Sequence, residues 1–311
     1  MATAAPPIPA SARVRIHRSA WLSILGQAAR TPRGRIALIL VAMVVSIAVV
    51  GIFYTPYSPT AFVTAPFAAP SSHFLLGGDN LGRDVLSRVL AGGWVLLIMA
   101  AAATAFGVIV GGAGGIAAAY LGGTTDSIIM RAADVVLAFP QLVLALLLVS
   151  ILGPKLWLIV LAVGISHAPQ VARVIRSATL DISERDYVKA VELDGVKRSR
   201  IMTGQILPNL VSPLMVEAGL RLTFSIVVIA GLSFLGFGQA PPAPNWGIMI
   251  NENRIGLQAN PWAVVVPALL IAALTVGTNT FSDSVSKVAI GAERKSEQLT
   301  LLEGRSTGNG S

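Results

Sequence analysis

Residues 89–125 read VLAGGWVLLIMAAAATAFGVIVGGAGGIAAAYLGGTT, with no charged side chain in the whole stretch. A helix that spans a membrane needs about 20 mostly apolar residues, and we place one such helix over residues 94–120. Gly107, Gly111 and Gly115 recur at every fourth position, a spacing that lets helix backbones approach closely in lipid. The stretch therefore predicts an integral membrane protein in which this helix packs tightly against a neighbour.

Five further apolar segments lie on either side of this stretch and give an all-α fold with six transmembrane helices. The first is longer than the roughly 7–15 apolar residues of a signal peptide, which favours a retained span over a cleaved one. Pro140 interrupts the third span, and Pro169 lies near the end of the fourth. The five segments are residues 36–53, 135–152, 156 to about 171, 213–237 and 261–281.

The composition agrees with lipid as the solvent. Apolar residues make up 54% of the chain and charged residues 12%, whereas a soluble domain carries roughly 25% charged residues. The net charge is +8, but the chain lacks the lysine-rich tail that would indicate nucleic acid as a partner. The chain has no cysteine, and its histidines lie in separate segments, so we predict no disulfide, no metal site and no cofactor.

The basic residues predict the orientation. Residues 1–35 carry six arginines and no acid, which places this tail in the cytoplasm by the positive-inside rule. The segment after the fourth span is also basic, whereas the segments assigned to the outside are poorer in basic residues. We therefore expect a cytoplasmic basic tail over 1–35, a six-helix membrane domain over 36–290 and a disordered cytoplasmic tail over 291–311.

A polar segment, DISERDYVKAVELDGVKRSRIMTGQILP, separates the fourth and fifth spans at residues 181–208. We expect a short helix that Ser183 caps together with Asp186 and that Gly195 ends. A second short helix begins at about Lys197, and Pro208 breaks or kinks the chain. The apolar flank of the first helix consists of Ile182, Tyr187, Ala190, Val191 and Leu193.

This helix–glycine–helix segment resembles the cytoplasmic coupling loop of bacterial ABC-importer permeases. Their signature is Glu-Ala-Ala, three residues, Gly, a spacer and Leu-Pro. Here Lys189, Ala190 and Val191 occupy the first three positions, Gly195 is the glycine, and Leu207-Pro208 closes the motif. Lysine thus replaces the glutamate of the family, and valine replaces the second alanine.

Three other segments resemble motifs of the dipeptide/oligopeptide permease family, in which this pattern is similar to the "C" member of a permease pair. The resemblance runs from about residue 38 to residue 289. Gly78 stands where the family usually has threonine. The segments are LGGDNLGRDVLSRVLAGG at 76–93, DSIIMRAADVVLAFPQLVLAL at 126–146 and GLSFLGFGQAPPAPNWGIMI at 231–250.

The resemblance implies a type I ABC importer permease that moves dipeptides or oligopeptides inward across the bacterial cytoplasmic membrane. Its implied partners are a second permease in a heterodimer, one or two cytoplasmic ATPase subunits and an extracytoplasmic peptide-binding protein. The residues implied to couple the chain to an ATPase are Tyr187, Lys189, Ala190, Val191, Leu193, Gly195, Leu207 and Pro208.

Two kinds of alternative stay open. The family also includes nickel and glutathione importers. A secondary transporter driven by an ion gradient is the alternative from another class, but the spans lack convincing midplane acids. The chain has no Gly-x-x-x-x-Gly-Lys-[Ser/Thr] loop for phosphate, so we expect a non-catalytic subunit whose energy comes from partners.

Charged and aromatic residues near the outer ends of the spans are candidates for substrate contact or gating. They are Asp79, Arg83, Asp84 and Trp246. The alternative for the first three is a local charge network with Arg88 that ends the loop and starts the second span. For Trp246 the alternative is a place in the aromatic belt at the membrane surface. Glu217 and Arg221 are spaced to pair on one helix face.

Overall fold

The computed structural model describes residues 19–239 and 241–308. These residues are almost entirely helical and contain no strand, only two isolated bridges in the loop after the first span, Phe62 with Arg83 and Gly78 with Asp84. Residues 1–18 of the predicted basic tail lie outside the described part, and residues Ser19–Arg30 form helix α1. The predicted all-α fold class is thus confirmed.

Five helical segments are long and apolar enough to cross a membrane, or six if the bent pair α5 and α6 is one span. The pair is bent by 87°, because Pro140 stands between the two helices and cannot continue the first. The spans consist of α2 (Pro32–Phe53), α3 (Val85–Ala91) with α4 (Gly93–Leu121), α5 (Gly123–Leu137) with α6 (Gln141–Leu152), α7 (Leu156–Ser183), α10 (Val211–Leu232) and α12 (Trp262–Gly308).

The helices differ from the predicted segments mainly at their ends. Helix α5 begins twelve residues before the third predicted span, and α7 runs twelve residues beyond the fourth. The sequence predicts a disordered tail from residue 291, whereas the structure continues α12 to Gly308. Hydropathy marks the apolar part of a helix, but the backbone hydrogen bonds continue into the polar part outside the lipid.

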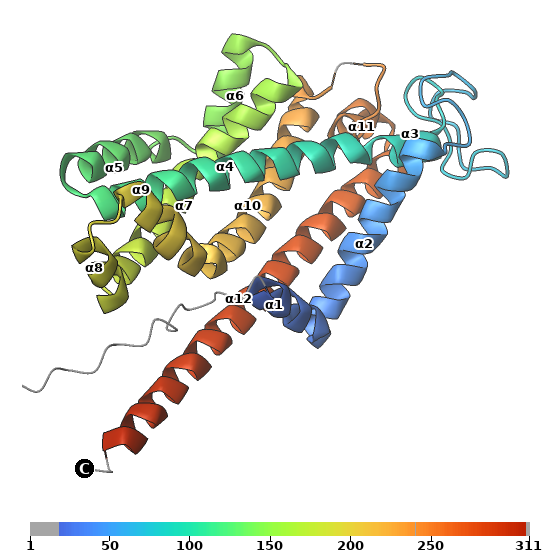
Figure 1. The fold of residues 1–311 in the computed structure, drawn as a ribbon. Helices are drawn as coiled ribbons and strands as arrows, with labels where there is room; N and C mark the ends of the chain where they lie inside the picture. The colour runs from blue at the N-terminus through green and yellow to red at the C-terminus, as the bar shows by residue number, and fades with distance from the viewer. Residues whose placement is uncertain (1–18, 240, 309–311) are drawn as a thin grey trace, which may run out of the picture.

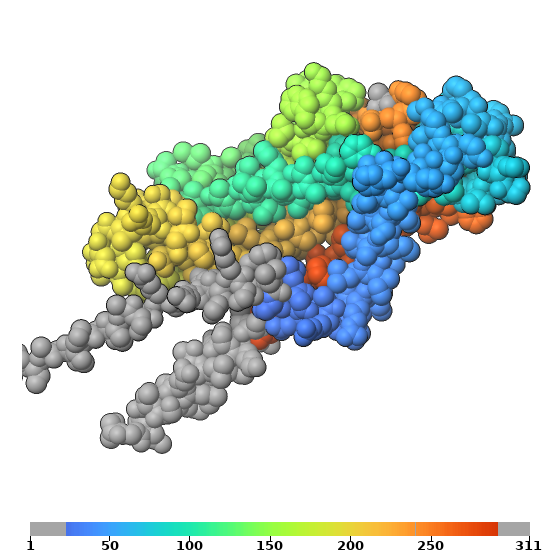
Figure 2. All heavy atoms as spheres, turned by 45° about the vertical axis from the view of Figure 1, so that its right-hand side comes forward, coloured from blue at the N-terminus to red at the C-terminus, as the bar shows by residue number. Residues whose placement is uncertain are grey.

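Short helical pieces connect the spans at both ends of the bundle (Figure 1). At one end, the loop of residues 54–84 lies beside α3 and α11, and Figure 2 shows it covering that end of the molecule. The pieces α8 and α9 lie at the opposite end. The connecting pieces are α8 (Asp186–Leu193), α9 (Arg198–Ile201), η1 (Met202–Ile206), η2 (Leu207–Leu210), η3 (Ser233–Phe237), α11 (Trp246–Asn253) and η4 (Arg254–Gly256).

Helices α4 and α7 form the most extensive helix pair in the described chain. A Cβ atom on Gly111 would lie 2.4 Å from the carbonyl oxygen of Ala168, and one on Gly115 would lie 2.6 Å from that of Ala172. Both distances are too short for any side chain. The predicted packing role of the glycine stripe is confirmed, because only glycine permits this approach of the two backbones.

The surface of the bundle is strongly apolar. Ile36 and Ile39 on α2, Ile109 on α4 and Ile151 on α6 are each more than half exposed. A soluble protein rarely exposes apolar faces of this extent, whereas lipid tails solvate them. The chain is therefore a multi-pass membrane protein, as its hydropathy predicts.

Candidate functional site

The polar loop between the fourth and fifth spans, residues 184–210, begins with helix α8. Helix α7 extends to Ser183, and only Glu184 and Arg185 separate it from α8. The predicted capping box is wrong: Arg185 is the N-cap residue, and it makes no side-chain capping bond. The hydroxyl of Ser183 instead donates to the carbonyl oxygen of Leu180, 2.9 Å away within α7, so it is not free to cap the next helix.

Val188 anchors α8 to the rest of the chain. Its side chain is completely buried and packs in an apolar cluster with Ile182, Ile201 and Ile206. Val191, one turn further along α8, is partly buried against the same cluster. The predicted apolar flank omits Val188, although two of its members, Ile182 and Val191, pack on the same cluster.

The opposite face of α8 is covered by none of the residues that the structure describes. Leu193 is 89% exposed and Tyr187 38% exposed, and Lys189 and Ala190 are also exposed. The residues predicted to couple this loop to a partner therefore separate into two groups. Of the five that lie on α8, Val191 packs on the apolar cluster and the other four are exposed.

Gly195 ends α8 in a Schellman motif. Its φ angle is +73°, a conformation that strains every residue except glycine and, to a lesser degree, asparagine. The amide of Gly195 donates to the carbonyl oxygen of Glu192 at 3.0 Å, and that of Val196 donates to Val191 at 3.4 Å. These are the two bonds of the motif, and both valines pack on the cluster around Val188. The predicted helix end is confirmed.

The second half of the polar loop stays helical up to the fifth span. Helix α9, the π-turn η1 and the 3₁₀-turn η2 follow one another and continue directly into α10. Pro208 does not break the chain, because it occupies the first turn of η2, where its missing amide is tolerated. Leu207 is exposed and Pro208 partly buried. Asn209, in the same turn, donates from Nδ2 to the hydroxyl of Tyr187 on α8 at 3.2 Å.

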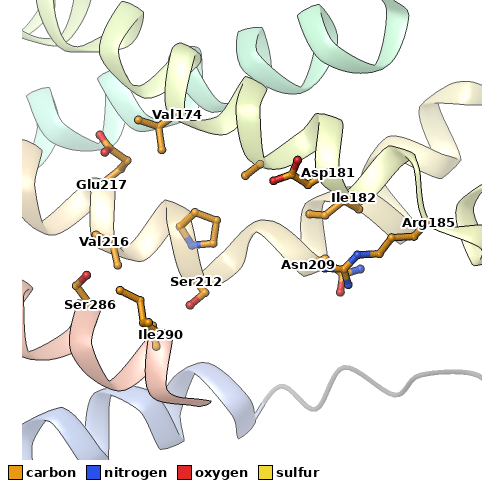
Figure 3. Close-up of a pocket in the computed structure, with 13 residues that line it drawn as sticks. Val174, Asp181, Ile182, Arg185, Asn209, Ser212, Val216, Glu217, Ser286 and Ile290 are labelled. Atoms are coloured by element: carbon orange, nitrogen blue, oxygen red, sulfur yellow. The ribbon is translucent and has the colours of Figure 1, made fainter. Parts of the chain in front are cut away.

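A cavity of about 820 Å³ lies beside the polar loop, between α7, α10 and α12. Figure 3 shows Arg185 and Asn209 at the end next to the polar loop and Glu217 at the other end. Asp181 on α7 and Ile290 on α12 belong to opposite walls. The lining is mixed, with charged, amide and hydroxyl groups among aliphatic side chains.

Polar side chains continue from the inner end of this cavity into the bundle. Glu217 accepts from Nε of Arg221 at 3.1 Å, which confirms the predicted pair, and Arg221 also donates to Gln170 on α7. Further along α10, the hydroxyl of Ser225 lies 3.0 Å from Nε2 of His167 and 3.0 Å from Oγ1 of Thr104. These contacts tie α4, α7 and α10 together inside the apolar bundle, where polar groups need internal partners.

At the opposite end, the predicted outer cluster is a buried charge network. Asp79, Arg83 and Arg88 are each at most 1% exposed. Oδ2 of Asp79 lies 2.6 Å from Nε of Arg83 and 3.2 Å from Nε of Arg88. Asp84 caps α3 by accepting from the amide and hydroxyl of Ser87. The network ends the loop and starts the second span, as the alternative interpretation predicts.

Glu252 on α11 completes this network and was not among the candidates predicted from the sequence. Its Oε2 lies 3.0 Å from Nη2 of Arg83 and 3.1 Å from Nη2 of Arg88. The two arginines thus share two carboxylates, one from the loop and one from a helix more than 160 positions further along. A buried arginine needs such partners, and that requirement is the only signal that could have predicted a distant acid.

Trp246 is fully buried in the main apolar cluster, so its predicted place in a surface belt is wrong. Its Nε1 donates to the carbonyl oxygen of Val89 at 2.7 Å, and its ring lies against Gly93. Trp157 and Trp262 are 59% and 45% exposed, as residues at a membrane surface would be. In this conformation Trp246 holds α11 against the start of the second span and offers no surface for stacking.

No group of three or more acidic or histidine side chains that could hold a metal ion occurs among the residues the structure describes. The polar features that the described residues do form are the polar loop, the adjacent cavity and the buried charge network. None of them brings together a nucleophile and a base in the arrangement that covalent catalysis needs.

Comparisons with known proteins agree with the multi-pass membrane fold described above. Residues 105–288 match the family described as "Binding-protein-dependent transport system inner membrane component". The chain is 34% identical over 257 residues to a dipeptide transport system permease protein of Haemophilus influenzae, covering 80% of this chain and 87% of the relative. It is 38% identical over 232 residues to a probable peptide ABC transporter permease protein of Sinorhizobium fredii, covering 74% and 79%. It is 34% identical over 270 residues to a glutathione transport system permease protein of Pectobacterium atrosepticum, covering 86% and 88%.

Proposed function

Since this chain belongs to the family of inner membrane components of binding-protein-dependent transport systems, we propose that it is the peptide-conducting permease subunit of an ABC importer. The observation that carries the proposal is the match to dipeptide and peptide permeases over most of both chains. A short helix that presents an uncovered face outside the apolar bundle supports it.

We propose that the outward face of α8 is where an ATPase subunit binds. Tyr187, Lys189, Ala190 and Leu193 would enter a groove of that subunit, and each large apolar side chain would contribute about 1.5–3 kcal/mol on full burial. Val188 and Val191 hold the other face of α8 on the chain. One face of α8 would therefore bind the ATPase, while the other is attached to this chain.

Gly195, Leu207 and Pro208 would serve this contact through shape. The Schellman motif at Gly195 fixes the angle between α8 and α9, and the η2 turn that begins at Leu207 joins the polar loop to α10 without a flexible break. A displacement of α8 would then move the end of the fifth span. Because ATP binding favours one arrangement of the ATPases, it would shift the spans between outward-open and inward-open states.

The partners and the energy source follow from the same proposal. A second permease would complete the pore as a heterodimer, and a binding protein would deliver the peptide from outside. The chain itself would hydrolyse no ATP, because its sequence has no phosphate-binding loop. The buried network of Asp79, Arg83 and Asp84, together with Trp246, would act at the outer face as a rigid support for the gate.

The orientation that suits this mechanism places the polar loop and both termini in the cytoplasm and residues 54–84 outside. The charge distribution supports it, since arginines without acids precede α2 and basic residues are frequent in the polar loop. In a bacterium, the membrane concerned would be the cytoplasmic membrane.

Glutathione is the second candidate substrate, because relatives named as glutathione permeases are as similar to this chain as those named for dipeptides. Glutathione is itself a tripeptide, so one transport pathway through the membrane could accept both substrates.

Uptake into proteoliposomes tests the proposal. The chain would be reconstituted with its partner permease, ATPases and binding protein, and uptake of labelled dipeptide, oligopeptide, glutathione and Ni²⁺ would be measured with ATP inside. We expect ATP-dependent peptide uptake that a protonophore leaves unchanged, and no ATP hydrolysis by this chain alone. Uptake driven by an ion gradient without ATP would overturn the proposal, and exclusive uptake of glutathione or Ni²⁺ would replace the peptide assignment.

A further inference from the structure

One hydrogen bond connects the proposed coupling helix to the cavity beside it. Nδ2 of Asn209 donates to the hydroxyl of Tyr187 at 3.2 Å and to the carbonyl oxygen of Gln205 at 2.6 Å. A side-chain amide nitrogen has two hydrogens, so both donors of Asn209 are used. One bond holds α8, and the other holds the turn between η1 and η2.

Asn209 lies where the type of helix changes between the polar loop and α10. The chain changes from π-turn to 3₁₀-turn just before it, and the α-helical ladder of α10 begins just after it. Irregular helical turns have weaker internal bonding than an α-helix. If α8 moved, these irregular turns could deform and α10 would stay in place. The hydrogen bonds of Asn209 stiffen the turns at this point.

Asn209 also belongs to the wall of the cavity between α7, α10 and α12. Arg185, the N-cap residue of α8, lines the same end of the cavity (Figure 3). The residue that bonds to α8 and the residue that precedes its first turn thus both form part of the cavity wall. A displacement of α8 relative to α10 changes the shape of this cavity directly.

The apolar cluster around Val188 also reaches α10, because Leu214 packs against it. Apolar packing is non-directional, so a hydrogen bond between the same elements adds a contact of defined geometry. Among the side-chain hydrogen bonds of the described residues, the Tyr187–Asn209 bond is the one that joins α8 to the turn leading into α10.

We propose that Asn209 is a positioning residue that transmits movement of α8 to α10 and to the cavity wall, and that the hydroxyl of Tyr187 is its contact on α8. This inference rests on the proposed function, since it presumes an ATPase that moves α8. It gives Tyr187 two separate roles. The ring meets the partner, and the hydroxyl meets Asn209.

The two roles are separated by Tyr187→Phe, which keeps the ring and removes the hydroxyl. In the reconstituted complex, we expect the number of peptides transported per ATP hydrolysed to fall roughly fivefold, the factor that one ordinary hydrogen bond corresponds to. Asn209→Leu removes this bond and the one to Gln205, so it should lower the ratio at least as much. The double variant should be no worse than Asn209→Leu alone, because the Tyr187–Asn209 bond is already lost there. Thr203→Val is the matched control. It removes a hydroxyl that bonds within the polar loop, to Ser199, and should leave the ratio unchanged.

A distance measurement tests the same inference without transport. The chain has no cysteine, so spin labels on Asp181→Cys and Ile290→Cys report the distance across the cavity in a complex with cysteine-free partners. We expect this distance to change on ATP binding in the otherwise unchanged chain and to respond less in the Tyr187→Phe chain. ATP-driven uptake by the wild-type complex, together with an unaltered ratio and an unaltered distance response in Tyr187→Phe, would overturn this inference and leave the proposed function intact. Absence of uptake in the wild-type complex would instead contradict the proposed function.

Discussion

Arg88 and Glu252 are 164 positions apart in the chain, yet Nη2 of Arg88 lies 3.1 Å from Oε2 of Glu252. The bond joins α3, at the start of the second span, to α11, which precedes the last span. Arg88 is buried and also lies 3.2 Å from Asp79. One side chain thereby ties the loop of residues 54–84, α3 and α11 into a single layer at this end of the bundle.

Glu252→Ala tests how much this layer depends on the shared carboxylate. The substitution leaves two buried guanidinium groups with Asp79 as their remaining acid, and we expect a loss of stability of about 3 kcal/mol. The measurement is the unfolding midpoint in detergent. Arg254→Ala, two residues away, changes an exposed side chain for which the described chain shows no ion pair. Equal midpoints for the two variants would show that the network adds no stability.

Trp246→Phe tests the second attachment of α11. The smaller ring leaves the carbonyl oxygen of Val89 without the donor that now lies 2.7 Å away, and a buried unsatisfied carbonyl costs about 1–3 kcal/mol. Trp262→Phe is the control, because Trp262 is nearly half exposed. We expect a lower unfolding midpoint for the first variant alone. A larger loss for Trp262→Phe would contradict the buried placement of Trp246.

Gly195→Val tests the turn that ends α8. No atom within 4 Å would meet a Cβ atom there, so the cost comes from the backbone conformation alone, about 1–3 kcal/mol for a residue other than glycine. We expect α8 to tilt and peptide uptake to fall sharply, while the chain still inserts at the normal level because its spans are unchanged.

Gly195→Asn is the matched control for that substitution, because asparagine tolerates positive φ better than a β-branched residue. It should retain most of the uptake and most of the stimulation of ATP hydrolysis by the loaded binding protein. Normal uptake in Gly195→Val would show that this turn does not position a coupling helix.

Single cysteines test the orientation, since the chain has none of its own. Ser72 and Asp186 are both exposed and lie at opposite ends of the bundle. We expect an impermeant maleimide to label Ser72→Cys in intact spheroplasts and Asp186→Cys only after the membrane is permeabilised. Labelling of Asp186→Cys in intact spheroplasts would reverse the proposed topology.

The sequence was sufficient for the features that depend on neighbouring residues. The charge-free stretches predicted where the spans lie, Pro140 predicted the break between α5 and α6, and Gly195 predicted the end of α8. Glu217 and Arg221 were paired correctly, because a separation of four residues brings side chains together on any α-helix. Each of these features follows from hydropathy or helix geometry over a few turns.

Only the tertiary structure decided which side chains from distant segments meet. It turned Val188 inward and left Leu193 uncovered, buried Trp246 against Val89, and brought Glu252 to Arg88. It also placed Asn209 beside Tyr187 and in the wall of the cavity. The physical reason is that local sequence sets the apolar face of a helix, whereas the partner of a buried charge or hydroxyl depends on how the helices pack and which loops cover their ends.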